Sequence, residues 1–128
     1  MLTNSPICPT LPTTDLQRSK DFYVNKLGLS VEKESEQGIF YKAGKNTKLY
    51  IYKRPPSPAE HTLAAFDVDD IDATIDELTQ KGVTFEHYDF PGLKTNEKGI
   101  ADSVEEGVRG AWFKDPDGNI LAISQQTK

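Results

Sequence analysis

The stretch TTDLQRSKDFYVNKLGL (residues 13–29) is the most informative about the fold, because the chain returns to the same pattern in FDVDDIDATIDELTQKGV (residues 66–83). Each stretch leaves an alternating strand, reaches an aspartate followed by leucine or isoleucine, and continues with helical spacing to a glycine and an apolar residue. The second copy is one residue shorter between its aspartate and its glycine. A period of about 55 residues is too long for a typical solenoid repeat and indicates two halves of one domain.

Both copies carry the signals of a helix. Asp15 and Asp70 are expected to cap the first turn, because a carboxylate oxygen there accepts hydrogen bonds from free backbone N–H groups. Gly28 and Gly82 fit positions just past a helix end, where the backbone is left-handed. The apolar positions at near-helical spacing are Leu16, Phe22, Tyr23 and Leu27 in the first copy and Ile71, Ile75 and Leu78 in the second.

Alternating segments follow each helix and predict strands. They are residues 29–36, 38–43 and 47–53 in the first copy and 83–88, 109–115 and 118–125 in the second. The order β-α-β-β-β therefore occurs twice, which predicts an α+β fold in a single domain spanning residues 1–128. We expect a first module over about 6–54, a stiff linker over 55–60 and a second module over about 61–126.

Composition excludes several classes of protein. The net charge of −5 comes from interspersed acidic and basic residues, which argues against the clustered cations of a nucleic-acid-binding protein. No apolar run of about 18 residues is present, and the N-terminal sequence lacks the regions of a signal peptide. A single cysteine rules out an internal disulfide framework. We therefore expect a cytoplasmic protein with no membrane or nucleic-acid partner.

With WFKDPDGNILAI (residues 112–123), the two repeated stretches resemble the signature segments of the vicinal oxygen chelate superfamily. That group contains glyoxalases, extradiol dioxygenases, fosfomycin-modifying enzymes and bleomycin-binding proteins. YDFPGLKTNEKGIADS (residues 88–103) is similar to a subgroup of small bacterial members. The resemblance implies two βαβββ modules that form a curved mixed sheet, with helices on the outer face and ligands in a concave cleft. It also implies a homodimer.

Strand alternation within that fold predicts the residues that line the cleft. They are Cys8, Phe40, Tyr50, Tyr52, His61, Leu63, Trp112 and Ala122. Aromatic walls with a few hydroxyl groups are typical of a pocket for a small molecule. The alternative is that some of the aromatic residues face outward as ordinary strand residues.

Metal-dependent members of the superfamily bind the ion through four side chains, usually His, Glu, His and Glu. Carried over by position, these ligands fall at Cys8, at Tyr50 or Tyr52, at Leu63 and at Ala122. Leucine and alanine coordinate nothing, and a Cys/Tyr pair is a poor site for a hard metal ion. The sequence therefore predicts no metal and no other cofactor.

Other residues leave alternatives open. His61 precedes Leu63 by two positions and is the candidate for a shifted metal ligand, while Cys8 is a candidate nucleophile. His87, at the end of a predicted strand among polar neighbours, is a candidate functional residue. The long connection over residues 89–110 contains four glycines and a proline, and we expect it to be a lid.

The leading hypothesis is a metal-free small-molecule binding protein that sequesters its ligand as the bleomycin-binding branch does. One alternative is a lyase or dioxygenase of the same superfamily with a rearranged site that uses His61, Cys8 or a tyrosine. Another is a metal-free enzyme in which Tyr50 or Asp67 acts as acid or base. Whether the protein is an enzyme therefore stays open at this point.

Overall fold

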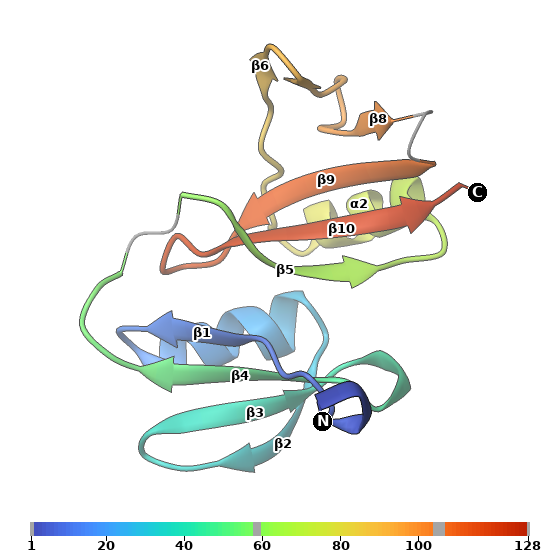
Figure 1. Ribbon diagram of the computed structural model, residues 1–128. Coiled ribbons are helices and arrows are strands. Elements are labelled where there is room, and N and C mark those ends of the chain that lie inside the picture. The colour runs from blue at the N-terminus through green and yellow to red at the C-terminus, as the bar shows by residue number, and fades with distance from the viewer. Residues whose placement is uncertain (1, 58–59, 104–106, 128) are drawn as a thin grey trace. The chain divides into compact units, whose positions relative to one another are not determined.

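The computed structural model describes residues 2–57, 60–103 and 107–127, and the chain divides into two compact units between residues 57 and 58 (Figure 1). Each unit contains its own four-stranded mixed sheet and one main helical segment. The predicted α+β class with two modules is therefore confirmed. No helix in the described part of the chain is long and apolar enough to span a membrane.

The first unit contains four strands in the order β1-β4-β3-β2. Its strands are β1 (Thr10–Thr13), β2 (Ser30–Glu34), β3 (Gly38–Lys42) and β4 (Lys48–Lys53), and its helical elements are η1 (Leu2–Asn4), α1 (Leu16–Lys20), η2 (Asp21–Lys26) and η3 (Gly44–Asn46). β1 is parallel to β4, whereas the other neighbouring pairs are antiparallel. All three strands that we predicted after the first helix are present.

The helix of the first unit changes its hydrogen-bond pattern halfway. Asp15 caps it as predicted, because its Oδ1 accepts from the backbone N–H groups of Gln17 and Arg18, each at 3.1 Å. The second half, η2, is a π-helix, in which the N–H of Leu27 donates to the carbonyl of Phe22 at 3.0 Å. A π-helical turn accommodates one additional residue. This turn therefore holds the extra residue that distinguishes the first sequence copy from the second.

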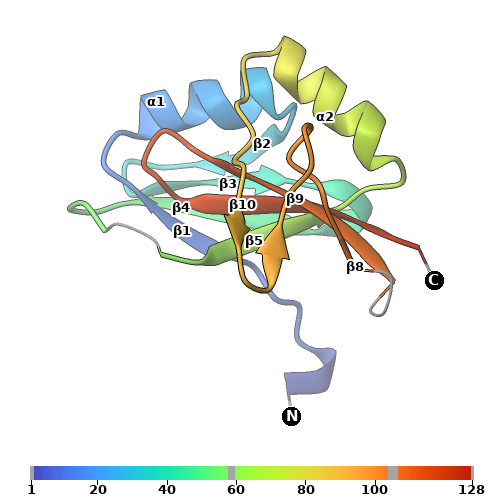
Figure 2. The ribbon, with the colours of Figure 1, turned by 90° about the horizontal axis from the view of Figure 1, so that it is seen from above.

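One face of the first sheet packs against this helix (Figure 2). The buried residues are Leu11, Ile39, Tyr41, Leu49 and Ile51 from the strands and Phe22 and Tyr23 from the helix. Tyr23 and Tyr41 bring their ring centroids to 5.5 Å across this contact. Because successive strand residues alternate between the two sides of a sheet, the residues between these core positions belong to the opposite side. We refer to the side of each sheet away from its helix as the open face.

The second unit contains a sheet in the order β5-β10-β9-β8 and a separate hairpin. Its elements are β5 (Thr62–Asp67), α2 (Ile71–Gln80), the hairpin strands β6 (Asp89–Phe90) and β7 (Leu93–Lys94), β8 (Ala101–Ser103), β9 (Val108–Lys114) and β10 (Ile120–Gln126). β5 is parallel to β10, and the remaining pairs are antiparallel. Asp70 caps α2 by accepting from the N–H of Ala73 at 3.0 Å. Gly28 and Gly82 have φ of +77° and +95°, as predicted for residues that end helices.

The strand predicted over residues 83–88 is wrong. This segment makes a single bridge to the sheet, between Phe85 and Phe113, and the strand beside β9 is β8 instead. The reason lies at Tyr88, whose N–H donates to the Thr95 hydroxyl at 2.8 Å and whose carbonyl accepts from the Thr95 N–H at 2.9 Å. These bonds commit the Tyr88 backbone to the hairpin and draw the chain away from β9.

The connection over residues 89–110 is more ordered than a simple loop. It contains the hairpin β6–β7 and strand β8, while residues 104–106 lie outside the described residues, as do 58–59 of the predicted linker. The Asn96 Oδ1 atom accepts from the N–H groups of Lys98 and Ile100 at 2.9 and 3.0 Å. Lys98 then bonds to Asp72 of α2 at 3.1 Å. The part of this segment before β8 is thus fixed to the helix, and a lid role stays a prediction.

Candidate functional site

Three aromatic rings lie together on the open face of the first unit. Phe40 of β3 and Tyr50 of β4 are partners in the strand register and stack with ring centroids 4.3 Å apart. Tyr50 and Tyr52 follow along β4 with centroids 6.2 Å apart and an angle of 9° between the ring planes. All three side chains are only partly buried. The rings therefore offer a nearly continuous apolar surface to a planar molecule.

Gly38 makes room for this aromatic cluster. A Cβ atom at this position would stand 2.6 Å from Cζ of Tyr50 and 2.7 Å from the carbonyl oxygen of Ile51. The ring of Tyr50 thus extends over the backbone of β3, which no other residue type at position 38 permits without movement. A glycine inside a strand often indicates such a close approach. The sequence carried this signal, but the cleft prediction did not use it.

Cys8 lies just before β1 and is half-buried. The hydrogen bond and charge of Glu32, at 2.7 Å, raise the pKa of Lys48, and Cys8 acts on Lys48 in the same direction with a smaller effect. The Cys8 thiol therefore lies near Lys48, at the start of β4. The Cys8 Sγ atom donates to the Pro9 carbonyl at 3.6 Å, and in the described part of the chain it forms no hydrogen bond with a basic side chain that would activate it as a nucleophile.

The open face of the second unit is built around Trp112. Strand register places Trp112 of β9, Ala122 of β10 and Ala65 of β5 in one row across the sheet. The indole meets Tyr88 at 5.7 Å between centroids and nearly at a right angle. The side chains in this row beside the indole are therefore the short ones of Ala122 and Ala65. The register thus pairs Trp112 with Ala122, two of the residues predicted for the cleft, and their role in binding a ligand stays a prediction.

A second row runs beside the first. Gly110, Ser124 and Asp67 are partners in the register, and the Ser124 hydroxyl donates to Oδ1 of Asp67 at 3.1 Å. A Cβ at Gly110 would stand 3.4 Å from Cη2 of Trp112. The indole therefore leans along β9 over Gly110, toward the row that ends in Asp67. Ser124 was predicted to face the cleft by alternation, whereas Gly110 was missing from the predicted cleft, and the glycine inside a strand was again the available signal.

The placement of His61 and Leu63 by simple alternation is not supported by the register. Thr62 pairs with Ile120 and Ala64 pairs with Leu121, so a bulge inserts Leu63 between them. A bulge interrupts the alternation of side chains along a strand. His61 precedes the strand and is exposed. The shared face of His61, Leu63 and Ala65, on which a shifted ligand depended, therefore cannot be derived from alternation.

The side chains at the family's metal-binding positions do not fit a metal ion. Two of those positions hold Leu63 and Ala122, which have no donor atom, and Ala122 is only 7% exposed. Within residues 2–57, 60–103 and 107–127, no three His, Cys, Asp or Glu side chains come together as a potential metal site. A divalent ion in proteins requires several N, O or S ligands. We therefore derive no chemistry through a metal.

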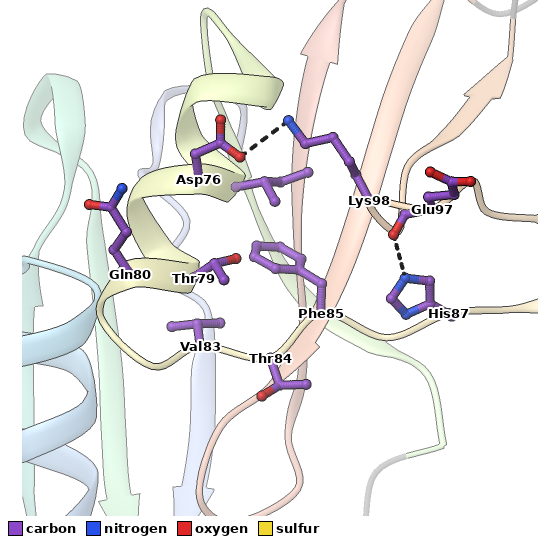
Figure 3. Close-up of a pocket in the computed structure, with 10 residues that line it drawn as sticks. Asp76, Thr79, Gln80, Val83, Thr84, Phe85, His87, Glu97 and Lys98 are labelled. Carbon is purple, nitrogen blue, oxygen red and sulfur yellow. Dashed lines mark hydrogen bonds and ion pairs between the residues drawn. The ribbon is translucent and has the colours of Figure 1, made fainter.

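A separate cavity of about 590 Å³ lies beside α2 in the second unit (Figure 3). Its buried apolar residues are Ile75, Val83 and Phe85. His87 lies at its edge, with Nε2 3.0 Å from the Glu97 carbonyl, and Lys98 forms an ion pair with Asp76 at 3.3 Å. These polar groups join the 83–88 and 96–100 segments and connect the latter to α2. The contacts of His87 thus explain local structure, and a functional role for His87 stays a prediction.

Comparison with known proteins places these features in a family. Residues 7–123 match the model of the Glyoxalase/Bleomycin resistance protein/Dioxygenase superfamily. The uncharacterized protein YraH of Bacillus subtilis (strain 168) is 28% identical over 130 residues, which cover 88% of this chain and 91% of YraH.

Solved structures with a similar fold agree with this family match. TnmS3, an antibiotic binding protein from Streptomyces sp. CB03234, is 26% identical with a TM-score of 0.70 and 98% coverage of both chains. A glyoxalase/bleomycin resistance protein/dioxygenase from Alicyclobacillus acidocaldarius is 21% identical with a TM-score of 0.69, covering 98% of this chain and 93% of its own. The two mixed sheets, the repeated capped helix and the matched residues 7–123 lead to one assignment: the chain belongs to the Glyoxalase/Bleomycin resistance protein/Dioxygenase superfamily.

Proposed function

We propose that this chain is a metal-free small-molecule binding protein of the glyoxalase/bleomycin resistance type, in which the aromatic open face of a sheet binds the ligand. The observation that carries the proposal is the cluster of Phe40, Tyr50 and Tyr52, which stack at 4.3 and 6.2 Å on a partly exposed sheet face. Half-exposed aromatic rings bind planar ligands at a low entropic cost, because each ring has few rotatable bonds.

The second unit supports the same role. Trp112 is partly exposed and stands beside the small side chains of Ala122 and Ala65. An indole next to short alanine side chains suits a flat apolar group of a ligand, while Ser124 and Asp67 provide directed polar contacts. The likeness to TnmS3, an antibiotic binding protein, favours binding over catalysis and a ligand of drug-like size.

The donor atoms support binding without a metal. Leu63 and Ala122 stand where two side chains would complete a metal site, and no three His, Cys, Asp or Glu side chains come together within the described residues. The remaining polar groups, two tyrosine hydroxyls and one carboxylate, suit hydrogen bonding to a ligand. A protein that only sequesters its ligand needs no more than this.

The test combines metal analysis with a ligand screen. Tag-free protein is dialysed against chelator, its divalent metal per chain is counted, and its thermal midpoint is measured with a panel of planar aromatic compounds. We expect less than stoichiometric metal, together with compounds that raise the midpoint whether or not chelator is present. Tyr50→Ala and Trp112→Ala should each weaken binding by about tenfold. Leu2→Ala, at a side chain that is 79% exposed, is the matched surface control.

Contrary outcomes lead to the enzyme alternatives. Stoichiometric metal lost in His61→Ala or Cys8→Ala would replace the proposal with a lyase or dioxygenase that has a rearranged site. Turnover that survives chelation and is lost in Tyr50→Phe or Asp67→Asn would replace it with a metal-free enzyme. We further propose that the protein is a cytoplasmic homodimer without nucleic-acid or membrane partners. Size-exclusion chromatography with light scattering measures its mass directly.

A further inference from the structure

We infer that Asp67 selects the ligand, so that the open face of the second unit takes a planar aromatic cation. The inference rests on the proposed function and deepens it, because it names the charge of the ligand and the residue that recognises it. Three features lead to it: the position of Asp67 relative to Trp112, the state of its carboxylate, and the size of the side chains between them.

The two register rows set the distance between the strand that carries Trp112 and Asp67. Gly110, Ser124 and Asp67 lie on the neighbouring strands β9, β10 and β5, in that order. Strands in a sheet are about 4.8 Å apart, so the backbones of Gly110 and Asp67 are separated by roughly 10 Å. The indole of Trp112 leans over Gly110 and so reaches toward this row. The span from the indole to the carboxylate matches one aromatic ring that carries a cationic substituent.

Small side chains line this span: Ala65 is exposed, Ser124 is partly buried and Ala122 is buried. Between the indole and the carboxylate stand Ala122, Ala65 and Ser124, none of which extends far above the sheet. The Ser124 hydroxyl donates to Oδ1 of Asp67 at 3.1 Å, which orients the carboxylate along the row. A ligand that lies flat against the indole therefore points its edge at the Asp67 carboxylate. Because an ionised carboxylate only accepts hydrogen bonds, the substituent on that edge of the ligand must donate them.

The charge of Asp67 is not compensated inside the unit. Among the residues that the structure describes, no salt bridge includes Asp67, and its side chain is exposed. The nearest cation along β9, Arg109, is held by Asp102 at 2.7 Å and by Asp72 at 3.0 Å. A positive ligand gains a charge-assisted ion pair with Asp67, while a negative one is repelled. The face therefore discriminates by charge.

The test uses the single tryptophan of the chain as a local reporter. Benzamidine, benzamide and benzoate have nearly the same shape and carry a positive, zero and negative charge. Each is titrated into the full chain while Trp112 fluorescence is recorded. We expect benzamidine to bind at least about tenfold more tightly than the other two. Asp67→Asn should remove this preference, because it should weaken benzamidine binding much more than benzamide binding.

Controls separate charge at this site from general effects. Asp67→Asn keeps an oxygen that accepts from Ser124, so it should fold normally, which its circular dichroism and thermal midpoint verify. Asp69→Asn removes an exposed carboxylate two residues away and changes the net charge equally, and we expect it to retain the preference. The preference should also weaken as the salt concentration rises.

Either of two results would overturn the inference. If Asp67→Asn binds benzamidine as tightly as the wild type, another group recognises the charge; if none of the three probes perturbs Trp112, the face does not bind this class of molecule. The proposed function is tested separately by the aromatic panel and the metal count. A neutral aromatic compound that binds through Trp112 without a contribution from Asp67 would preserve that function and contradict the charge selection.

Discussion

The ring of Tyr50 lies over Gly38, so close that a Cβ at position 38 would stand 2.6 Å from Cζ of the tyrosine. The same Cβ would stand 2.7 Å from the carbonyl oxygen of Ile51, which belongs to the strand backbone and cannot rotate away. Gly38→Ala should therefore lower the free energy of unfolding by about 1–3 kcal/mol, as overpacking does. Urea denaturation followed by circular dichroism measures the loss.

Gly44 provides the matched control for this substitution. A Cβ at Gly44 would have nothing within 4 Å, and Gly44 is not among the glycines with positive φ. Gly44→Ala should change stability by less than about 0.5 kcal/mol. Equal stability of the two variants would show that the contact between Gly38 and Tyr50 does not constrain the sheet.

Removing the cap of α2 should cost stability. Asp70→Ala deletes the carboxylate that accepts from the Ala73 N–H at 3.0 Å, and such a loss typically costs about 1 kcal/mol. Asp70→Asn, which retains a capping oxygen, should cost less. Thermal unfolding of the three proteins at one pH ranks them, and an order with Asn below Ala would contradict a capping role.

Asp72 connects two cations and should make stability depend on pH. Hydrogen bonds from Arg109 and Lys98 lower the pKa of Asp72 from its ordinary value. A depressed pKa in the folded state means that the stabilisation is complete above the unfolded pKa, about 3.9, and is lost as the pH falls through the folded value. Urea midpoints of the wild type and Asp72→Asn should differ at neutral pH and converge in acid. A constant difference across that range would contradict this role of the ionised carboxylate.

Tyr41 should weaken the fold in alkali. Burial, assisted by the charge of Glu34, raises the pKa of Tyr41 to about 12, whereas an unfolded tyrosine ionises near about pH 10. The unfolded state therefore loses its proton first, and stability falls as the pH rises between these two values. Tyr41→Phe should show a shallower decline in this range. Tyr52→Phe, which removes a partly exposed hydroxyl, controls for the substitution, and identical alkaline profiles of all three proteins would rule out the effect.

Local signals predicted the frame of each module because they depend on neighbouring residues. Asp15 and Asp70 cap helices and Gly28 and Gly82 end them, since capping and a left-handed backbone are decided within a few residues. The extra residue of the first copy was visible in the sequence, but its accommodation in a π-helix was not. That turn depends on how Phe22 and Tyr23 pack against the sheet.

Longer-range pairing was predicted less well. The sequence of residues 83–88 alternates as a strand does, yet the backbone N–H and carbonyl of Tyr88 form hydrogen bonds with Thr95. The strand beside β9 is instead formed by residues 101–103. His61 and Leu63 were placed by alternation, and the bulge at Leu63 interrupts it. A competing hydrogen bond or a bulge leaves no clear periodic signal, so a single sequence could not reveal either one.

Residue type and spacing were enough to predict the two-module α+β fold, the aromatic residues available for a ligand and the lack of donors at Leu63 and Ala122. Which of those residues meet became clear from the folded structure. Phe40 stacks on Tyr50 because strand register aligns them, and the indole of Trp112 lies over Gly110, in the row that ends in Asp67. Register and close approach depend on strands far apart in the chain, and no local pattern contains them.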